Sequence, residues 1–429
     1  MVGSIGVMSE LTVARWEFAA TTSFHFLFVL LTLGLVTLVA ILQTRYAFTK
    51  NPEHLRQVRF WGQLYVVNYL VGIASGVLME FQLGLNWAGL NKLVGGVFGA
   101  PLTMETLVAF FIESTLLGIW IFGWDRIGRV AHTVVIWLVC VTAYLSAFWV
   151  LVANSFLHHP VGYAIQGDVG ILTDFGALLT NPNLWLAFPH VASAGIMVGA
   201  WFMIGVSTWH LRRGRDREFF LPTLRFALPI ATLAAGAQIY TGVRQFHVFT
   251  LIPAKAAMWH ESPVEMAKVQ ADLSAQYGPG NYLPPDWIHW AGDTMLYIGI
   301  VLAAVGLVAS LFLFRDRLLR WSWPLRLLTY LMFLPFLAAI AGWVWREVGR
   351  QPWVVYGVLK TDQAISGVGA TTVGVSFAIF AVLFAFLGGL DWILLTRLAK
   401  RGPGWTFWSV PSDDSGIEPV RDDLEMVTL

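Results

Sequence analysis

The sequence predicts an all-α membrane protein with nine transmembrane helices, and two observations carry this prediction. Of the 429 residues, 57% are hydrophobic and 12% are charged, whereas roughly 25% of the residues in a soluble globular protein are charged. The apolar residues also gather in runs long enough for the roughly 20 residues that cross a bilayer as one helix. A lipid bilayer is therefore the expected surrounding of most of the chain.

Nine apolar runs divide the chain into spanning and connecting segments. They cover about residues 20–43, 61–84, 102–123, 130–154, 184–209, 222–243, 288–314, 325–345 and 373–396. Residues 1–243 then hold helices one to six, the first four as one bundle, and residues 288–397 hold helices seven to nine. Residues 244–287 form a long connection, and such connections in compact proteins are usually functional or disordered. Residues 398–429 form a tail rich in Pro, Ser and acids.

Basic residues mark one side of the predicted bundle. Arg212, Arg213, Arg215 and Arg217 follow the fifth run, and similar clusters follow the other odd-numbered runs. The alternate loops are poor in Lys and Arg, with none between residues 156 and 184. By the positive-inside rule the N-terminus lies outside, the C-terminal tail is cytoplasmic, and segment 244–287 is external. The start of the chain lacks the pattern of a cleaved signal peptide, so the first helix would target the protein.

Charge and cysteine content exclude several function classes. The formal net charge of +1 argues against a nucleic-acid partner, because phosphate binding needs a concentrated basic surface. Cys140 is the single cysteine, so the chain forms no internal disulfide and has no Cys-x-x-Cys-His motif for covalent haem attachment. Any haem would be held by coordination and packing alone.

Ionisable side chains within or next to the apolar runs are functional candidates, because a bilayer makes their burial costly. With the thioether of Met295, the candidates are His25, Glu80, Glu105, Glu113, His132, His190, Asp293, Arg346, Glu347 and Arg350.

Two of these histidines suit axial haem ligation. His25 is expected about one turn inside the first helix, among Phe24, Phe26 and Phe28, on an apolar wall of the kind that a haem ligand occupies. His190 precedes small residues that leave room for a flat macrocycle. The alternative for both is a histidine that hydrogen-bonds a neighbouring helix.

The acidic candidates have two interpretations each. Glu105 and Glu113 are eight residues apart, which places them along one side of an α-helix about 12 Å apart in rise. They could pass protons through ordered water, or be protonated structural acids. Glu347 is near the external end of its helix beside Arg346 and one turn before Arg350. It could ligate haem iron while an arginine pairs with propionates, or the group could be an interfacial salt bridge.

Seven segments in order resemble signatures of subunit I of the cytochrome bd oxidases. The resemblance is dense over residues 10–210 and 324–362, in FHFLFVLLTLG, FWGQLYVVNY, GIASGVLMEFQLGLNW, FGAPLTMETLVAFFIEST, IFGWDRIGR, LSAFWVLVANSF and GWVWREVGRQPW. In that family a His of the first helix and the Glu before Gly-Arg-Gln-Pro-Trp each hold one haem of a high-spin pair, which match His25 and Glu347. A His of the fifth helix and a Met of the seventh clamp a low-spin haem b, which match His190 and Met295.

The resemblance also implies cofactors, partners and an activity. The cofactors would be a low-spin haem b, a high-spin haem b, and a haem d or a third haem b. Glu105 and Glu113 would deliver protons, and Trp343 and Arg350 would shape the haem environment. Quinol would donate electrons on the external side, and O2 would be reduced to water with cytoplasmic protons, without proton pumping. Such a chain works as a heterodimer with a second membrane subunit, with small single-helix subunits as further candidates, in the bacterial or archaeal cell (inner) membrane.

The electron-entry region departs from the family pattern in three places. The chain reads TGVRQFHVF where relatives have Gly-Asp and Ser-Gly, and it has His260 at the position of a glutamate. Lys255 is kept and Glu261 is one residue later, so these two are the quinol-binding candidates. Asp293 replaces an arginine two positions before Met295, which would lower the potential of the low-spin haem if the Asp is ionised. His289 also stays open as a ligand in place of Met295.

Three alternatives follow from the same residues. A haem–copper oxidase needs an adjacent histidine pair within the membrane, whereas His158 and His159 precede Pro160 at a loop. A transporter would have internal repeats and broken helices at matching positions, which the sequence does not show. A relative of the bd family with a non-quinol donor, or without oxidase activity, stays open because of the altered loop.

Overall fold

The computed structural model describes residues 9–246 and 251–408, apart from the side chains of residues 108–110 and 315. Within these residues, nine helical runs are long and apolar enough to cross a membrane, which confirms the nine predicted spans. They are α1 (Glu10–Thr49), α2 (Pro52–Asn86), α3 with η1 and α4 (Ala88–Thr106, Leu107–Glu113, Ser114–Phe122), α5 (Arg129–His158), α7 (Pro182–Leu211), α8 (Arg217–Arg244), α12 (Ile288–Leu313), α13 with α14 (Ser322–Leu331, Leu334–Val348) and α16 (Ala370–Arg401).

Short elements connect these spans. They are β1 (Tyr163–Gln166), β2 (Val169–Leu172), α6 (Phe175–Leu179), α10 (Pro253–Trp259), α11 (Pro263–Tyr277), η2 (Phe314–Arg320), β3 (Trp353–Val355), β4 (Leu359–Lys360) and α15 (Thr361–Ala364). β1 and β2 pair antiparallel, as do β3 and β4. The first eight residues, most of the tail 398–429, and the last part of the TGVRQFHVF segment lie outside the described residues.

Polar caps begin α1, α2 and α7 ahead of their apolar runs. Ser9 caps α1 by accepting a hydrogen bond from the backbone of Thr12, and Asn51 caps α2 in the same way. Asn181 caps α7, which begins with Pro182. These residue types favour helix starts. As a consequence His25 lies fifteen residues after Glu10, about four turns into α1, so the expectation of a position one turn inside the helix was wrong.

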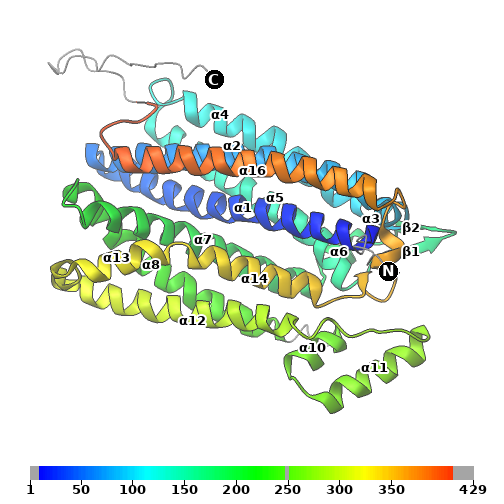
Figure 1. Cartoon of the computed structure of the whole chain (residues 1–429). Coiled ribbons are helices and arrows are strands. Elements are labelled where there is room, and N and C mark those ends of the chain that lie inside the picture. Colours follow the sequence, from blue (N-terminus) through cyan, green and yellow to red (C-terminus); the bar gives the residue numbers. More distant parts are fainter. Residues whose placement is uncertain (1–8, 247–250, 409–429) are drawn as a thin grey trace, which may run out of the picture.

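The long helices run roughly along one axis, with α1 and α7 side by side at the centre (Figure 1). Glycines allow these two helices to approach closely. A Cβ atom on Gly34 would clash with the carbonyl oxygen of Gly195 and lie 2.7 Å from the backbone nitrogen of Gly199. Gly195, one of the small residues after His190, therefore serves the contact between α1 and α7.

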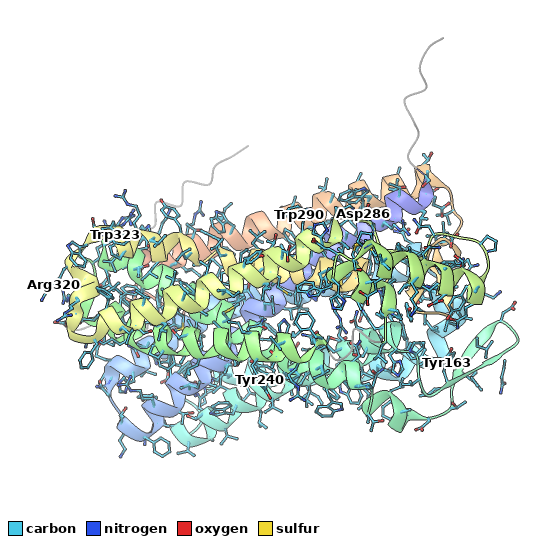
Figure 2. All side chains as sticks on the ribbon, turned by 90° about the horizontal axis from the view of Figure 1, so that it is seen from below. Tyr163, Tyr240, Asp286, Trp290, Arg320 and Trp323 are labelled. Atoms are coloured by element: carbon cyan, nitrogen blue, oxygen red, sulfur yellow. The ribbon has the colours of Figure 1, made fainter. Side chains whose placement is uncertain are left out.

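The start of α1, the β1–β2 hairpin and helices α10 and α11 lie at one end of the bundle, and the end of α16 lies at the other (Figure 1). Figure 2 places Tyr163 at the same end as Asp286, and Arg320 and Trp323 at the opposite end. The described residues of segment 244–287 thus lie at the end of the bundle where α1 begins. There, α10 and the start of α12 bury Met258 and Ile288 against Trp345 of α14.

Two spans are irregular. The run from Leu107 to Glu113 is a π-helix, a conformation that is rare and frequent at functional sites. The α-helical spacing assumed for Glu105 and Glu113 therefore does not hold between them. The eighth span is broken between Leu331 and Leu334, with Pro335 in the first turn of α14, where its missing N–H leaves no helical hydrogen bond unmade.

Candidate functional site

His25 is held in the tautomer that a metal ligand needs. Its Nδ1 lies 2.9 Å from Oγ of Ser75 on α2, and that hydroxyl donates to the carbonyl oxygen of Gly72 at 2.8 Å. Because the hydroxyl proton is used on Gly72, Ser75 accepts from Nδ1–H of His25, which leaves a lone pair on Nε2. Gly76 leaves space beside the ring, since a Cβ atom there would lie 3.0 Å from His25 Cε1.

His190 repeats this arrangement on α7. Its Nδ1 lies 3.1 Å from Oγ1 of Thr241 on α8, and Thr241 donates to the carbonyl oxygen of Ala237 at 2.7 Å. Nε2 of His190 therefore also carries a lone pair. Gly242 faces this ring, with a Cβ atom there 3.3 Å from His190 Cε1.

Met295 is a better candidate than His289 for the second ligand of the low-spin haem. Met295 lies against α14, where a Cβ atom on Gly342 would be only 2.5 Å from its sulfur. Both ring nitrogens of His289 have partners near segment 244–287 instead. Nδ1 lies beside the carbonyl oxygen of Asp286, and Nε2 lies 3.6 Å from the Glu261 carboxylate.

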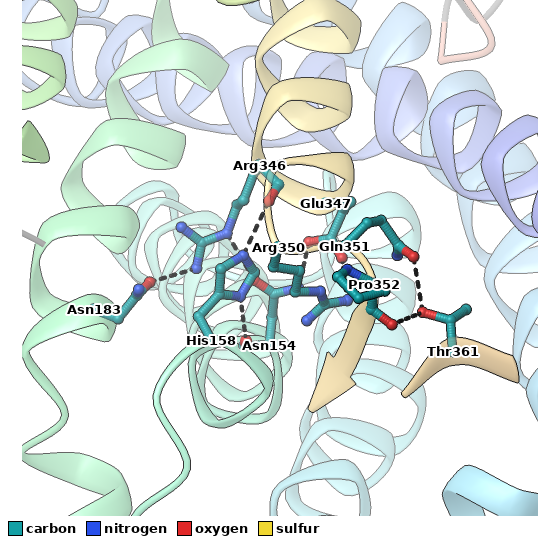
Figure 3. Close-up of polar contacts among 9 residues, drawn as sticks. All are labelled: Asn154, His158, Asn183, Arg346, Glu347, Arg350, Gln351, Pro352 and Thr361. Carbon is teal, nitrogen blue, oxygen red and sulfur yellow. Dashed lines mark hydrogen bonds and ion pairs between the residues drawn. The ribbon is translucent and has the colours of Figure 1, made fainter. Parts of the chain in front are cut away.

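Glu347 is the centre of a buried polar cluster at the end of α14 (Figure 3). The side chain is 9% exposed, and each carboxylate oxygen has a partner. Oε1 accepts from Nδ2 of Asn154 on α5 at 2.8 Å, and Oε2 forms an ion pair with Arg350. A carboxylate oxygen has two lone pairs, so these bonds orient Glu347 and still leave it able to coordinate iron.

Arg346 joins this cluster to two further helices. Its Nε donates to Oδ1 of Asn154 at 2.7 Å, and its Nη2 donates to Oδ1 of Asn183 on α7 at 2.6 Å. His158, at the end of α5, places Nε2 3.1 Å from the carbonyl oxygen of Arg346 and Nδ1 3.0 Å from that of Asn154. Figure 3 shows these groups converging from α5, α7 and α14.

The side chain of Arg350 indicates whether this site fits a haem. Its side chain is 4% exposed, and Nε and Nη1 are buried without a hydrogen-bond partner within the described residues. Burial lowers the pKa of Arg350, and the Glu347 carboxylate opposes that shift. Buried guanidinium donors without acceptors are costly, and a propionate would satisfy them bidentately. Together with the free Nε2 atoms of His25 and His190, the donor set fits haem.

Trp343 and the two predicted proton-delivery acids lie in separate places. The Trp343 ring is half-buried, 6.2 Å from the ring of Phe18 on α1. Glu105 accepts from Oγ of Ser146 on α5 at 3.0 Å, and the carboxyl of Glu80 on α2 lies nearby. Glu113 is 3% exposed, and its Oε1 has no hydrogen-bond partner among the described residues.

The two quinol candidates differ in burial. Lys255 on α10 is 6% exposed, and its Nζ lies 5.0 Å from the centre of the Trp345 ring. Burial, together with the charge of Arg346, lowers the pKa of Lys255 to about 7. Glu261 has a side chain that is 62% exposed and a left-handed backbone with φ of 49°. Lys255 therefore packs against the helix that carries Glu347, whereas Glu261 lies on the surface.

Sequence reasoning missed several residues of the site. Asn154, Asn183, Ser75 and Thr241 are neutral, and only ionisable groups were sought in the apolar runs. Asn154 was visible within LVANSF, where an amide in an apolar run is itself a signal. Asp391 is ionisable and lies within the ninth run, but it was overlooked. It is 6% exposed, and its Oδ1 has no hydrogen-bond partner in the part of the chain that the structure describes.

Comparison with known proteins places this site in a family. The sequence matches the family described as cytochrome bd terminal oxidase subunit I over residues 13–276 and 274–403. It is 37% identical to cytochrome bd ubiquinol oxidase subunit 1 of Bacillus subtilis (strain 168), over 92% of this chain and 94% of that protein. It is 29% identical to cytochrome bd-II ubiquinol oxidase subunit 1 of Escherichia coli (strain K12), over 94% and 99% of the two chains.

A solved structure agrees with the fold. The bd oxidase from Geobacillus thermodenitrificans superimposes with a TM-score of 0.83 and 23% identity, over 92% of this chain and 99% of that chain. At this identity the match supports the fold, while the family rests on the sequence relatives. The match to the family model and to the sequence relatives excludes the haem–copper and transporter alternatives. The chain is a multi-pass membrane protein that belongs to the cytochrome bd oxidase subunit I family.

Proposed function

We propose that this chain is the haem-bearing subunit of a terminal oxidase that reduces O2 to water with electrons from quinol and protons from the cytoplasm. One observation carries the proposal. His25 and His190 are each bonded through Nδ1 to a hydroxyl that donates elsewhere, so each ring directs an unprotonated Nε2 away from its partner. This is how proteins prepare histidine to coordinate a metal.

Four residues would hold the haem irons. His190 and Met295 would clamp a low-spin haem b, and His25 and Glu347 would each hold one member of a high-spin pair. That pair would consist of a haem b and either a haem d or a further haem b. When bound, the haems supply electron transfer and the reduction of O2.

The remaining groups of the site bind charge and deliver protons. Arg350 uses Nη2 for its ion pair with Glu347. Its Nε and Nη1, which have no partner among the described residues, would bind a propionate. Glu113 would pass protons from the cytoplasmic side to Glu105, which is next to Glu80 and Ser146. The π-helix between the two acids supports this role, because such segments are frequent at functional sites.

Quinol would reach the protein at segment 244–287, on the external side that the positive-inside rule predicts. Lys255 and Glu261 are the candidate contacts. Lys255 links this segment directly to α14, since its side chain packs on Trp345 and approaches Gly349. The chain would work with a second membrane subunit in a bacterial or archaeal cell membrane, with small single-helix subunits as further partners.

A second candidate is an oxidase with a different electron donor. Two residues favour it. Asp293 is an acid two positions before Met295, and His260 is at the position where the family has an acid. His260 pairs with Glu265 at 3.2 Å on the surface. A cation at position 293 would favour reduction of the low-spin haem, whereas an acid opposes it. The haem ligands are the same in both candidates.

Purified protein, expressed with its partner subunit, separates these possibilities. We expect a low-spin haem b spectrum with one or two high-spin species, and oxygen uptake driven by reduced quinone analogues. Pyridine haemochrome analysis would distinguish haem d from haem b alone. Colourless, correctly folded protein would contradict both candidates. Haem-replete protein without uptake on any quinol would favour the second.

A further inference from the structure

We propose that Arg346 is a positioning residue that fixes the amide of Asn154 so that this amide donates to the Glu347 carboxylate. The inference rests on the proposed function, in which Glu347 is a haem ligand. Arg346 directly precedes Glu347 in the sequence. Its side chain does not bond Glu347 itself but acts on it through Asn154 of α5.

The Asn154 amide works as a bridge with two distinct ends. Its Oδ1 accepts from Nε of Arg346 at 2.7 Å, and its Nδ2 donates to Oε1 of Glu347 at 2.8 Å. An amide can rotate and exchange these ends. A guanidinium only donates, so Arg346 requires the oxygen end to face it. The nitrogen end is then left for Glu347, whereas the opposite orientation would place an amide oxygen against a carboxylate.

Arg346 is itself fixed by a second acceptor on α7. Its Nη2 donates to Oδ1 of Asn183 at 2.6 Å. The backbone N–H of Asn183 donates to Asn181, the residue that caps α7, and Asn181 in turn donates to the carbonyl oxygens of Ser155 and His159. The start of α7 is therefore tied to the end of α5, and both acceptors of Arg346 belong to one connected frame.

His158 lies between the backbones of the same two residues. The ring is 1% exposed, and its two nitrogens face the carbonyl oxygens of Asn154 and Arg346. A neutral imidazole has one N–H, so it donates to one of these oxygens and packs against the other. Lysine could not replace Arg346 in this frame, because a compact ammonium lacks the rigid planar fork that spans acceptors on two helices.

Two simpler roles for Arg346 lead to different expected results. Arg346 could act only as a positive charge that favours the reduced haem, in which case Arg346→Lys would preserve its effect. It could also act only in stability, in which case variants would alter the melting temperature and leave the haem spectra unchanged.

The test uses the intact complex with its second subunit. Arg346→Met removes charge and donors, Arg346→Lys keeps the charge and loses the fork, and Asn183→Ala loosens one anchor. Lys92→Met is the matched control, because Lys92 pairs at 3.4 Å with Asp168 and both side chains are exposed. Haem content, the electron paramagnetic resonance signal of the ferric high-spin haems, and oxygen uptake are measured for each variant.

We expect Arg346→Met and Arg346→Lys to broaden the high-spin signal alike and to lower oxygen uptake roughly 10-fold, as loss of residues that orient a metal ligand does. Asn183→Ala should give a weaker change of the same kind. A double variant that carries both Arg346→Met and Asn183→Ala should show no larger change than Arg346→Met alone. Lys92→Met should match the unaltered complex.

Three results would overturn the inference. They are an unaltered high-spin signal in Arg346→Lys, an unaltered signal in both Arg346→Met and Asn183→Ala, and additive effects in the double variant. If Arg346→Met does not assemble, the Arg346→Lys and Asn183→Ala signals decide. A haem-free unaltered complex would refute the proposed function as well, whereas a haem-replete, active complex with indifferent variants would refute only the role of Arg346.

Discussion

The Glu347 cluster and segment 244–287, where electrons are proposed to enter, both contact α14 but differ in how far their polar side chains are buried. Glu347 and Arg350 are 7% and 4% exposed, and they are hydrogen-bonded or ion-paired within a frame from three helices. In segment 244–287, the paired side chains of His260 and Glu265 are 58% and 46% exposed. α14 joins the two regions, because Trp345 faces Lys255 while Glu347 faces Asn154.

The chain should tolerate substitutions less well in the buried cluster than in the exposed part of segment 244–287. Removing one partner from a buried cluster leaves other charges or donors unsatisfied, which costs far more than losing an exposed ion pair. The departures from the family pattern that the sequence predicts lie in the electron-entry region, in line with this difference. The following substitutions test whether function divides along the same line.

Glu347→Gln should have the largest effect. The amide keeps the size of the side chain but has no charge to hold iron or balance Arg350. We expect loss of one high-spin haem signal and a fall in oxygen uptake of more than about 100-fold, because even residues outside the ligand shell are typically worth 10–100-fold. Glu265→Gln is the control in the exposed region and should have little effect. A full high-spin complement in Glu347→Gln would refute the ligand assignment.

Gly342→Ala should be next in size. The new Cβ atom would lie 2.5 Å from the sulfur of Met295, so the methionine must move. We expect the low-spin haem spectrum to convert partly to high spin, with a roughly 10-fold loss of uptake. Gly299→Ala is the control, because that position on α12 has no atom within 4 Å of an added Cβ. Equal spectra for the two variants would argue against Met295 as a ligand.

Lys255→Met should affect quinol use and leave the haem spectra intact. If Lys255 donates to the bound quinol, its loss should raise the KM for quinol about 10-fold, which corresponds to one hydrogen bond worth about 1.4 kcal/mol. Lys268→Met removes an exposed cation from the same segment and is the control. An unchanged KM would favour the candidate with another donor.

The sequence predicted the two regions unequally well, for physical reasons. Spans are readable because a bilayer demands about 20 apolar residues, and the Gly-Arg-Gln-Pro-Trp segment led directly to Glu347. The amides of Asn154 and Asn183 carry no charge, and their roles depend on contacts between residues far apart in sequence. The π-helix before Glu113 also leaves no signal in hydropathy. Only the structure could show that Lys255 is buried against Trp345.

The pH dependence of stability should show a smaller effect. Lys255 has a pKa lowered to about 7 in the folded protein, from 10.5. Between these values the unfolded chain binds the proton and the folded chain does not, so stability rises with pH, by at most about 1.4 kcal/mol per pH unit. Melting curves from pH 7 to 9 should show this rise. The rise should be weaker in Lys255→Met, and parallel curves would mean that Lys255 is charged when folded.

Asp293→Asn should produce the smallest change. Asp293 is half-buried, two residues before Met295. Removing its negative charge should raise the midpoint potential of the low-spin haem, because an anion near the iron favours the oxidised form. Asp272→Asn, on exposed α11, removes the same charge at the surface and serves as the control. A redox titration in which both variants match the unaltered complex would show that Asp293 does not act on this haem. The divergence at position 293 would then have no bearing on the choice of electron donor.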